Sequence, residues 1–531
     1  MRRRRASGAL AAAVMAAALP LLAAASESGA EDAARFARRE QDWRMGAVVY
    51  QVLVDRFAPP VDLQAKRPLY PPPKRLRDWS ELPRPGPYLE DQKLNAHELD
   101  FWGGDLAGLT AKLDHVTALG ADVLYLNPIH LAYTNHKYDA LDFQAISPEF
   151  GTRDDFRRLA AEARRHGLKV VLDGVFNHMG RNAPRFRDAM ADPRSPWRDW
   201  FAIGPQYRGG ARVWSGYQNL PELNLENPEV RRHLYAASDS VVRSYLRDGA
   251  DGWRLDTAYD LGPRVLRELT DAAHDEKPGS LVVGEFVNYP DRWLKSTDAA
   301  MNFTLRQILL GMAAGDIAPS VAARMTGRLV RDTGIEPMLM SWIVIDNHDI
   351  PRIATQLPDP AIRHLVQALQ FTLPGSPNLY YGAEIGMEGG PDPANRGPMQ
   401  WDRVTADNPE WVWTKRLVAL HRMHRALRIG DFRLLESGSL LAFERFTERT
   451  LEARIVIANP GQEPVRERLL LPDAYLMDGT PLKDLLGPAD AAPVAYVGAG
   501  VLDVTIPART AWVLQPVPPD LGGYSRYKRV P

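Results

Sequence analysis

The stretch Asp251-Gly252-Trp253-Arg254-Leu255-Asp256 decides how this chain is expected to fold. Side chains alternate in direction along a β-strand, so Arg254 and Asp256 point to one side. Trp253 and Leu255 then point to the other side, where they can face covering helices. The charged pair is left to face the mouth of a barrel, which predicts a polar site at the end of a buried strand.

Outward from this strand, apolar runs rich in β-branched residues alternate with amphipathic segments of helical period between residue 48 and about residue 381. This alternation predicts β/α units around a parallel sheet. Eight strands suit a closed (β/α)8 TIM barrel, although periodicity alone would also allow an open doubly wound sheet. The expected strands lie at 48–54, 123–126, 169–175, 251–255, 281–284 and 342–345, with weaker signals near 300–303 and 378–381.

Two insertions interrupt the alternation. The proline-rich segment 58–104 is expected to be a long loop after the first strand, and 178–224 an irregular subdomain after the third. Asn227-Pro228 then supplies an N-cap and a first-turn proline for a helix expected over 228–246. Long loops at strand carboxyl ends are where such barrels keep their binding sites.

Beyond a helix expected at 410–427, the pattern changes to alternating strands. It predicts a small antiparallel β-sandwich domain over 430–517, so that the barrel domain would cover 46–429. Residues 518–531 are expected to form a poorly ordered tail. The expected strands of the small domain lie at 440–445, 453–458, 466–470, 501–505 and 511–514.

Residues 1–25 are expected to be an export signal. Four arginines, Arg2 to Arg5, precede an alanine- and leucine-rich stretch that ends in the small residues Ala23-Ala24-Ala25. A basic nucleic-acid arm or a membrane anchor are alternatives, but the apolar stretch is short for a spanning helix. Its removal would change the net charge from -1 to -5. We therefore expect a periplasmic or secreted protein without a stable membrane span and without a nucleic-acid partner.

The composition bounds the chemistry. With 45% hydrophobic and 25% charged residues the chain is that of an ordinary globular protein, long enough for one large domain and one or two smaller ones. It contains no cysteine, which excludes disulfides, thiolate catalysis and cysteine-ligated zinc.

Carboxylates follow three of the expected strands. A guanidinium at Arg254 would favour the ionised form of Asp256, which is the form that a nucleophile needs. The apolar strand 281–284 ends at Glu285, and a partly desolvated glutamic acid can hold a proton for a leaving oxygen. The strand 342–345 runs into Asp346-Asn347-His348-Asp349. We expect the three strand ends to share one mouth.

Each of these sites alone could be structural, because Asp, Asn and Gly after strands often form turns or cap helices. Together they resist that interpretation. Arg254 and His348 gain nothing as caps, and a buried arginine without a carboxylate would be costly.

After residue 45 nearly the whole chain resembles the α-amylase family, glycoside hydrolase family 13. Five segments in the correct order and spacing carry the resemblance. Four of them are similar to the family's four successive motifs, in this order: Leu172-Asp173-Gly174-Val175-Phe176-Asn177-His178, 252–256, Val283-Gly284-Glu285 and 346–349. The fifth, Leu220-Pro221-Glu222-Leu223-Asn224, is similar to an auxiliary motif.

The resemblance implies a role for each matched residue. Asp256 would attack the anomeric carbon, Glu285 would protonate the leaving oxygen and later activate water, and Asp349 would bind sugar hydroxyls. Retention of configuration needs two carboxyl groups about 5–5.5 Å apart, which neighbouring strand ends can supply. The residues that would hold the sugar at the cleavage subsite are His178, Arg254 and His348.

Two further segments extend the implied site. Asn135-His136-Lys137-Tyr138-Asp139 places Tyr138 where the family stacks an aromatic ring on the sugar, with His136 beside it. The segment 389–396 resembles the one whose Asp392 and Arg396 grip the next glucose towards the non-reducing end. Without the resemblance, those two residues could equally form a surface ion pair.

These two segments most resemble those of cyclomaltodextrinases, neopullulanases and maltogenic amylases. Those enzymes usually carry an N-terminal β domain that helps to form a dimer. Only about twenty residues separate the expected signal from the first barrel strand, so we expect that domain to be absent. Oligomeric state cannot be carried over from the resemblance.

The resemblance implies a retaining hydrolase of α-1,4-glucosidic bonds in starch-derived oligosaccharides or cyclodextrins. A transglycosylase acting on maltooligosaccharides and a non-catalytic sugar-binding protein are the alternatives. No cofactor is expected to be required. A structural Ca²⁺ site made by Asn177 and carbonyl groups is an alternative that the sequence does not establish. Tyr259 and Asp260 stand where many α-amylases have lysine and histidine, which speaks against it.

Overall fold

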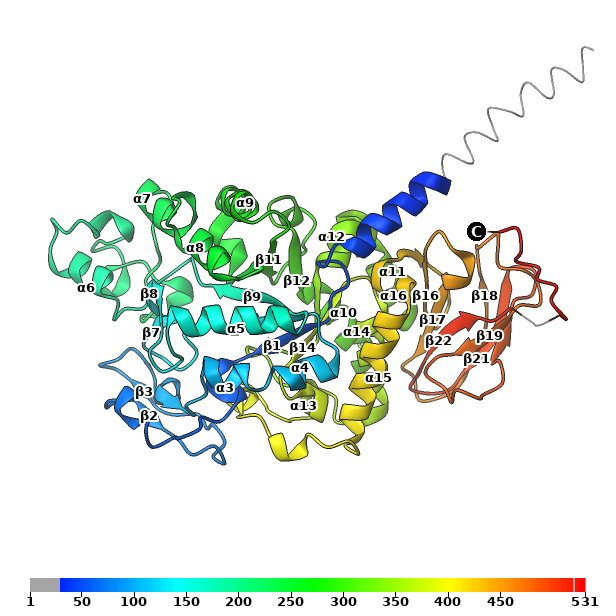
Figure 1. Ribbon diagram of the computed structural model, residues 1–531, viewed down its shortest axis with the longest axis horizontal. Coiled ribbons are helices and arrows are strands. Elements are labelled where there is room, and N and C mark those ends of the chain that lie inside the picture. Colours follow the sequence, from blue (N-terminus) through cyan, green and yellow to red (C-terminus); the bar gives the residue numbers. More distant parts are fainter. Residues whose placement is uncertain (1–28, 519–520, 531) are drawn as a thin grey trace, which may run out of the picture.

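The computed structural model describes residues 29–518 and 521–530 (Figure 1). The expected export signal at 1–25 lies outside the described residues. No helix within the described ranges is long and apolar enough to cross a membrane.

Eight parallel strands close into a barrel in which neighbours in sequence are neighbours in space, and the last strand pairs with the first. This confirms the closed barrel over the open sheet. The strands are β1 (Val49–Val52), β6 (Val123–Leu126), β9 (Lys169–Gly174), β10 (Gly252–Leu255), β11 (Leu281–Phe286), β12 (Ala299–Asn302), β13 (Trp342–Val344) and β14 (Ser376–Tyr380).

Helices surround this barrel on its outer side (Figure 1). The longer ones are α4 (Leu113–Leu119), α5 (Arg153–Arg165), α8 (Val241–Asp248), α9 (Ala258–Glu276), α10 (Phe303–Ala314), α11 (Pro319–Thr333), α14 (Pro360–Thr372) and α15 (Pro409–Met423). Short helices join them: α2 (Val54–Phe57), α3 (Leu106–Thr110), α12 (Ile335–Met340), α13 (Ile353–Gln356) and α16 (Arg425–Ile429).

Side-chain alternation along the strands separates two apolar layers. Trp253 and Leu255 of β10 belong to the large cluster shared with the outer helices, as their alternation predicted. A second cluster, which includes Val171 and Val283, fills the barrel interior. Arg254 has no exposed surface and lies in the same strand between the two outward-facing residues. The strand therefore carries one charged side chain into a packed interior.

The insertion after β1 contains only short elements: β2 (Arg75–Leu76), β3 (Tyr88–Leu89), β4 (Leu94–Asn95), a 3₁₀ turn at Ala96–Leu99, and β5 (Asp100–Phe101). The hairpin of β7 (His130–Ala132) and β8 (Ala140–Ile146) follows β6, and the insertion after β9 contains α6 (Pro184–Ala191) and isolated bridges such as His178 to Glu222. Both insertions are as irregular as the sequence suggested.

The single helix expected over 228–246 is wrong. Helix α7 (Pro228–Arg231) passes into a π-helical turn at Arg232–Ala236, and the chain is extended at Ala237 before α8 begins. The break contains Ser238, Asp239 and Ser240, whose side chains compete with helical backbone hydrogen bonds.

The C-terminal part is antiparallel. Its larger sheet has the order β15 (Asp431–Leu434), β16 (Leu441–Phe446), β17 (Arg454–Asn459), β22 (Thr510–Pro516), β19 (Pro481–Asp484) and β20 (Ala495–Tyr496). The pair β18 (Val465–Leu470) and β21 (Val501–Ile506) forms a second sheet. Leu469 and Leu502 of the pair share one apolar core with Ile455 and Leu514 of the larger sheet.

Both ends of the described chain are anchored. Residues 29–41 form a helix whose Arg39 is buried, and its guanidinium pairs with Glu336 at 2.7 Å and with Asp431 at 2.9 Å. The expectation of a poorly ordered tail is wrong for Tyr527, which is buried and accepts a hydrogen bond from the backbone of Met477 at 3.0 Å.

Candidate active site

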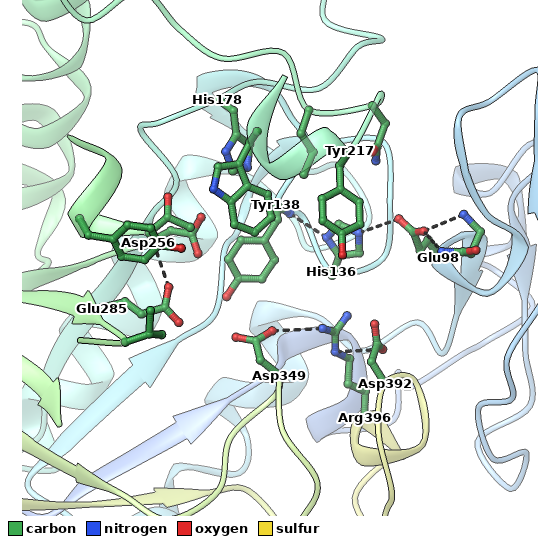
Figure 2. A pocket seen from close by; sticks show the side chains of 17 residues that line it. Glu98, His136, Tyr138, His178, Tyr217, Asp256, Glu285, Asp349, Asp392 and Arg396 are labelled. Atoms are coloured by element: carbon green, nitrogen blue, oxygen red, sulfur yellow. Dashed lines mark hydrogen bonds and ion pairs between the residues drawn. The ribbon is translucent and has the colours of Figure 1, made fainter. Parts of the chain in front are cut away.

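A cavity of about 490 Å³ opens where the barrel strands end, within the size range of small-molecule sites (Figure 2). Asp256, Glu285 and Asp349 all line it. The other predicted site residues on its wall are His136, Tyr138, His178, Asp392 and Arg396. Arg254 and His348 lie behind this wall as supports. The structure therefore brings together all the residues that the sequence singled out.

Arg254 is the centre of the charge arrangement. Its Nη1 donates to Asp173 Oδ1 at 2.7 Å and to Asp256 Oδ1 at 3.1 Å. Its Nη2 lies 2.9 Å from Glu285 Oε1. The pairing of β10 with β9 and β11 causes this, since Arg254 stands level with Asp173 on one neighbour and with Val283 on the other. One guanidinium thus serves three carboxylates.

This sharing affects the pKa of Asp256. Burial raises the pKa of Asp256 well above its ordinary range; Arg254 opposes the rise, whereas Glu285 and Asp173 add to it by repulsion. The sequence-based prediction that Arg254 keeps this carboxyl ionised assumed that the arginine contacts Asp256 alone. In the structure it also contacts Asp173 and Glu285. The carboxyl groups instead titrate together, because each one affects its neighbours.

Glu285 ends strand β11 in a buried position. Burial raises the pKa of Glu285 as well, against the opposing charge of Arg254. The backbone N–H of Thr257 donates to Glu285 Oε2 at 3.0 Å. Thr257 has φ 38° and ψ 47°, a left-handed conformation that is unusual for a β-branched residue. This strained turn, directly after Asp256, points an amide towards the neighbouring carboxyl group.

Asp349 and Asp392 share the guanidinium of Arg396. Arg396 Nη2 lies 3.3 Å from Asp349 Oδ1, and its Nε lies 3.3 Å from Asp392 Oδ1. The Arg396 side chain is only 10% exposed. Asp392 and Arg396 therefore do form an ion pair, but its guanidinium is buried and the pair lines the cavity beside the third carboxylate (Figure 2).

Tyr138 and His348 form a stacked pair with ring centroids 5.3 Å apart. The Tyr138 hydroxyl donates to Asp173 at 2.8 Å and lies 2.5 Å from His348 Nε2. Gln51 Nε2 lies 2.9 Å from His348 Nδ1 and is its donor. Burial lowers the pKa of His348 well below its ordinary value. A neutral histidine is thus held with its Nε2 proton directed to the Tyr138 oxygen.

His178 contributes its ring to the cavity wall, but its Nε2 atom is buried. Its Nε2 has no hydrogen-bond partner among the residues that the structure describes. Burial lowers the pKa of His178 to about 3, so the ring is neutral near neutral pH. Trp214 stacks on it with ring centroids 5.5 Å apart. The ring is therefore held neutral and covered at one edge of the cavity.

Sequence reasoning missed several residues of this cavity. Trp214 and Tyr217, from the irregular subdomain, stack with centroids 5.6 Å apart, and both line the wall. Trp214 Nε1 donates to Asp260 Oδ2 at 2.9 Å. Glu98 arrives from the long insertion after β1. A detectable signal existed for Glu98, since Asn95-x-x-Glu98 has the spacing of a helix capping box.

Asn177 is the side chain on which the possible calcium site depends. Asn177 is buried, and its Nδ2 lies 3.4 Å from His178 Nδ1. Within residues 29–518 and 521–530, no group of three or more His, Asp or Glu side chains is placed to hold a metal ion.

Comparison with known proteins agrees with this geometry. The model of the family described as "Alpha amylase, catalytic domain" matches residues 51–416. Neopullulanase 2 from Thermoactinomyces vulgaris is 32% identical over 440 residues, which cover 80% of this chain and 71% of that protein. A cyclomaltodextrinase from a Bacillus species is 33% identical over 63% of this chain and 62% of its own length.

Among solved structures, the fold matches a cyclic α-maltosyl-(1→6)-maltose hydrolase from Arthrobacter globiformis in complex with cyclic α-maltosyl-(1→6)-maltose. The TM-score is 0.73 at 30% identity. The match covers 89% of this chain and 99% of that one, whereas this chain spans only 62% and 71% of the two curated relatives above.

Proposed function

The chain belongs to the alpha-amylase family of glycoside hydrolases, and from this premise we propose that it hydrolyses α-1,4-glucosidic bonds of starch-derived oligosaccharides or cyclodextrins with retention of configuration. The observation that carries the proposal is the placement of Asp256 and Glu285 on one guanidinium at the cavity wall. Two carboxyl groups that contact the same guanidinium suit double displacement, which needs them about 5–5.5 Å apart.

In the first step, an oxygen of ionised Asp256 forms a bond to the anomeric carbon while the glycosidic bond breaks. The proton of Glu285 passes to the leaving oxygen. In the second step, Glu285 takes a proton from water, whose oxygen attacks the anomeric carbon and releases Asp256. Glu285 ends protonated again, so the cycle closes without a cofactor.

The surrounding groups would orient the sugar. Asp349 would accept hydrogen bonds from hydroxyls of the distorted ring. His178 and Tyr138 line the wall beside it, where their rings would contact the sugar. Asp392 and Arg396 would bind the next sugar towards the non-reducing end. Arg254 and His348 would act from behind the wall by fixing these groups.

The deciding experiment compares the purified protein with Asp256→Asn and Glu285→Gln variants. Reducing-sugar release is measured with soluble starch, maltotriose, cyclodextrin and pullulan. The matched control is Asp271→Asn, which makes the same change at an exposed position on α9. We expect the control to retain activity and both site variants to lose it. Activity that survives in Asp256→Asn would sink the proposed mechanism.

Transglycosylation is the second candidate, because the same carboxyl groups would pass the glycosyl unit to a sugar hydroxyl instead of water. Trp214 and Tyr217 give the cavity an aromatic wall on which an acceptor sugar could stack. Chromatography of a maltotriose digest distinguishes the two. Products longer than maltotriose would indicate transfer, and glucose with maltose alone would indicate hydrolysis. The third alternative, a non-catalytic sugar-binding protein, has no support in a family member with all three carboxylates in one cavity.

Cyclic α-maltosyl-(1→6)-maltose belongs in the same substrate panel. The hydrolase named for it aligns over 99% of its length with this chain, including the region outside the barrel. Preference for this cyclic sugar over cyclodextrin would narrow the proposed substrate class.

We also propose export, on the strength of the arginine run and apolar stretch in residues 1–25. The mature protein would act in the periplasm or outside the cell. N-terminal sequencing of protein recovered from those fractions tests this. A start at Met1 would contradict it.

A further inference from the structure

The mechanism leaves one carboxylate of the cavity without a role. Glu98 lies beyond His136, at the opposite end of the labelled residues from Asp256 and Glu285 (Figure 2). It belongs to the insertion 58–104, outside all the motifs that identify the catalytic groups. A charged residue brought to the wall by a separate loop invites the question of what it recognises.

Glu98 is held at both of its oxygens. Oε1 accepts hydrogen bonds from Asn95 N at 2.7 Å and from Asn95 Nδ2 at 3.1 Å. Oε2 accepts from His136 Nε2 at 3.1 Å. The tautomer of His136 is fixed, because its Nδ1 accepts from the backbone N–H of Tyr138 at 3.0 Å. Its Nε2 must therefore be the donor to Glu98.

These contacts leave one acceptor position open. A carboxylate offers about four lone-pair positions, two on each oxygen. Oε1 uses two and Oε2 uses one. The side chain keeps 14% of its surface exposed and lines the cavity. A capping box explains the contacts of Oε1 with Asn95 but not the position of Oε2 at the cavity wall.

The charge of Glu98 decides which ligand group it can accept. Burial would raise the pKa of Glu98, but the hydrogen bonds that it accepts from His136 and Asn95 lower it below its ordinary value. Near neutral pH the Glu98 carboxylate is therefore ionised, and it can accept hydrogen bonds but not donate them. It suits the hydroxyl of a neutral sugar and disfavours a phosphorylated or carboxylated one.

The loop is fixed relative to Arg396. Arg56 donates from Nη1 to the carbonyl of Arg396 at 2.5 Å and from Nη2 to the carbonyl of Asp100 at 3.1 Å. Asn135 N donates to the carbonyl of Glu98 at 2.8 Å. One buried guanidinium therefore ties the turn that carries Arg396 to the loop that carries Glu98. Side chains held this way can discriminate between ligands.

We propose that Glu98 is a specificity-determining residue that accepts a hydrogen bond from a hydroxyl of the sugar bound beside Asp392 and Arg396. This inference rests on the proposed function and deepens it. The sugar concerned is the second one from the cleaved bond on its non-reducing side. The enzyme should consequently favour substrates that place at least two sugars on that side.

Two aryl glycosides test this directly. A 4-nitrophenyl α-glucoside places one sugar on that side of the cleaved bond, and a 4-nitrophenyl α-maltoside places two. In Glu98→Gln, glutamine can still complete the capping box, but its amide cannot offer acceptors to both Asn95 and the cavity. We expect the ratio of kcat/KM for maltoside to that for glucoside to fall roughly tenfold, the effect of one hydrogen bond to a charged acceptor.

The matched control is Glu90→Gln, which makes the same change in the same loop at an exposed carboxylate paired with Lys93. Its ratio should equal that of the unmodified protein. Glu98→Asp provides a second variant, which keeps the charge but withdraws it from the cavity, and its ratio should also fall.

Each outcome decides the matter. If the unmodified protein is active and the ratio in Glu98→Gln stays within threefold, Glu98 does not select the second sugar. An equal loss on both glycosides also overturns the inference, since Glu98 then acts only by positioning His136. If the unmodified protein cleaves neither aryl glycoside nor maltotriose, the proposed function itself fails, and this inference fails with it.

Discussion

Replacing Arg254 by lysine should cripple turnover while preserving charge. Arg254 reaches Asp256 with Nη1 and Glu285 with Nη2, at 3.1 Å and 2.9 Å. A lysine has a single ammonium nitrogen on a flexible stem. It therefore cannot reproduce contacts that two separate nitrogens make, and at least one of the two catalytic carboxyl groups loses its cation.

The magnitude follows from that single lost contact. A hydrogen bond to a charged partner contributes about 1.5–3 kcal/mol. If the loss falls on the transition state, kcat/KM should drop roughly 10- to 150-fold. The acid limb of the pH profile should also shift to higher pH, because burial still raises the pKa of Asp256 while a single ammonium group can no longer contact both carboxyl groups.

The assay is maltotriose hydrolysis across pH, with Arg445→Lys as control. Arg445 is also fully buried, but it donates to the carbonyls of Thr372 and Gly430 outside the cavity. The control should lose thermal stability without losing kcat. The reasoning is refuted if Arg254→Lys keeps kcat/KM within threefold and its pH limbs do not move.

Three further results are expected. Activity needs ionised Asp256 and protonated Glu285, and burial raises the pKa of both groups. Both limbs of the bell-shaped kcat/KM profile should therefore lie above the ordinary carboxyl pKa values of about 4. Full activity below pH 4 would contradict this. Burial raises the pKa of Glu444 from 4.5 to about 7, so its contribution to stability is complete below pH 4.5 and is lost as pH rises through 7. Thermal melts of Glu444→Gln should therefore lack a stabilisation of about 3 kcal/mol that the unmodified protein gains between pH 8 and pH 4.5, and identical pH slopes would rule this out. Dialysis against EDTA should leave kcat and the melting temperature unchanged, whereas a loss restored by Ca²⁺ would reveal a metal requirement.

The barrel was predictable because its signal is local and repeated. The barrel strands are short and apolar, and helices alternate with them along the chain. The alternation of Trp253 and Leu255 with Arg254 was correct in the structure. The strand expected at 48–54 ends earlier, at Val52. The reason lies far away in sequence, since Asp55 accepts backbone hydrogen bonds from Trp102 and Gly103 and the chain turns to bring it there.

The members of the site were predictable, but their electrostatics were not. Motifs identify Asp256 and Glu285 one at a time, and each can be assigned a partner nearby in sequence. Asp173 also contacts Arg254, and this contact depends on the register of the adjacent strands β9 and β10. Glu98 was missed for the same reason, because its contact with His136 joins segments that no local pattern connects.

The helix formed by residues 29–41 has a consequence for how the molecule comes apart. It precedes the first barrel strand, and in Figure 1 it lies beside α12 and α16. Arg39 pairs with Glu336 on α12 of the barrel and with Asp431 on β15 of the sandwich. Separating the two units would remove one of the two carboxylate partners of this buried cation, which is unfavourable. Barrel and sandwich should therefore melt as one cooperative body, fastened by a segment that carries none of the chemistry.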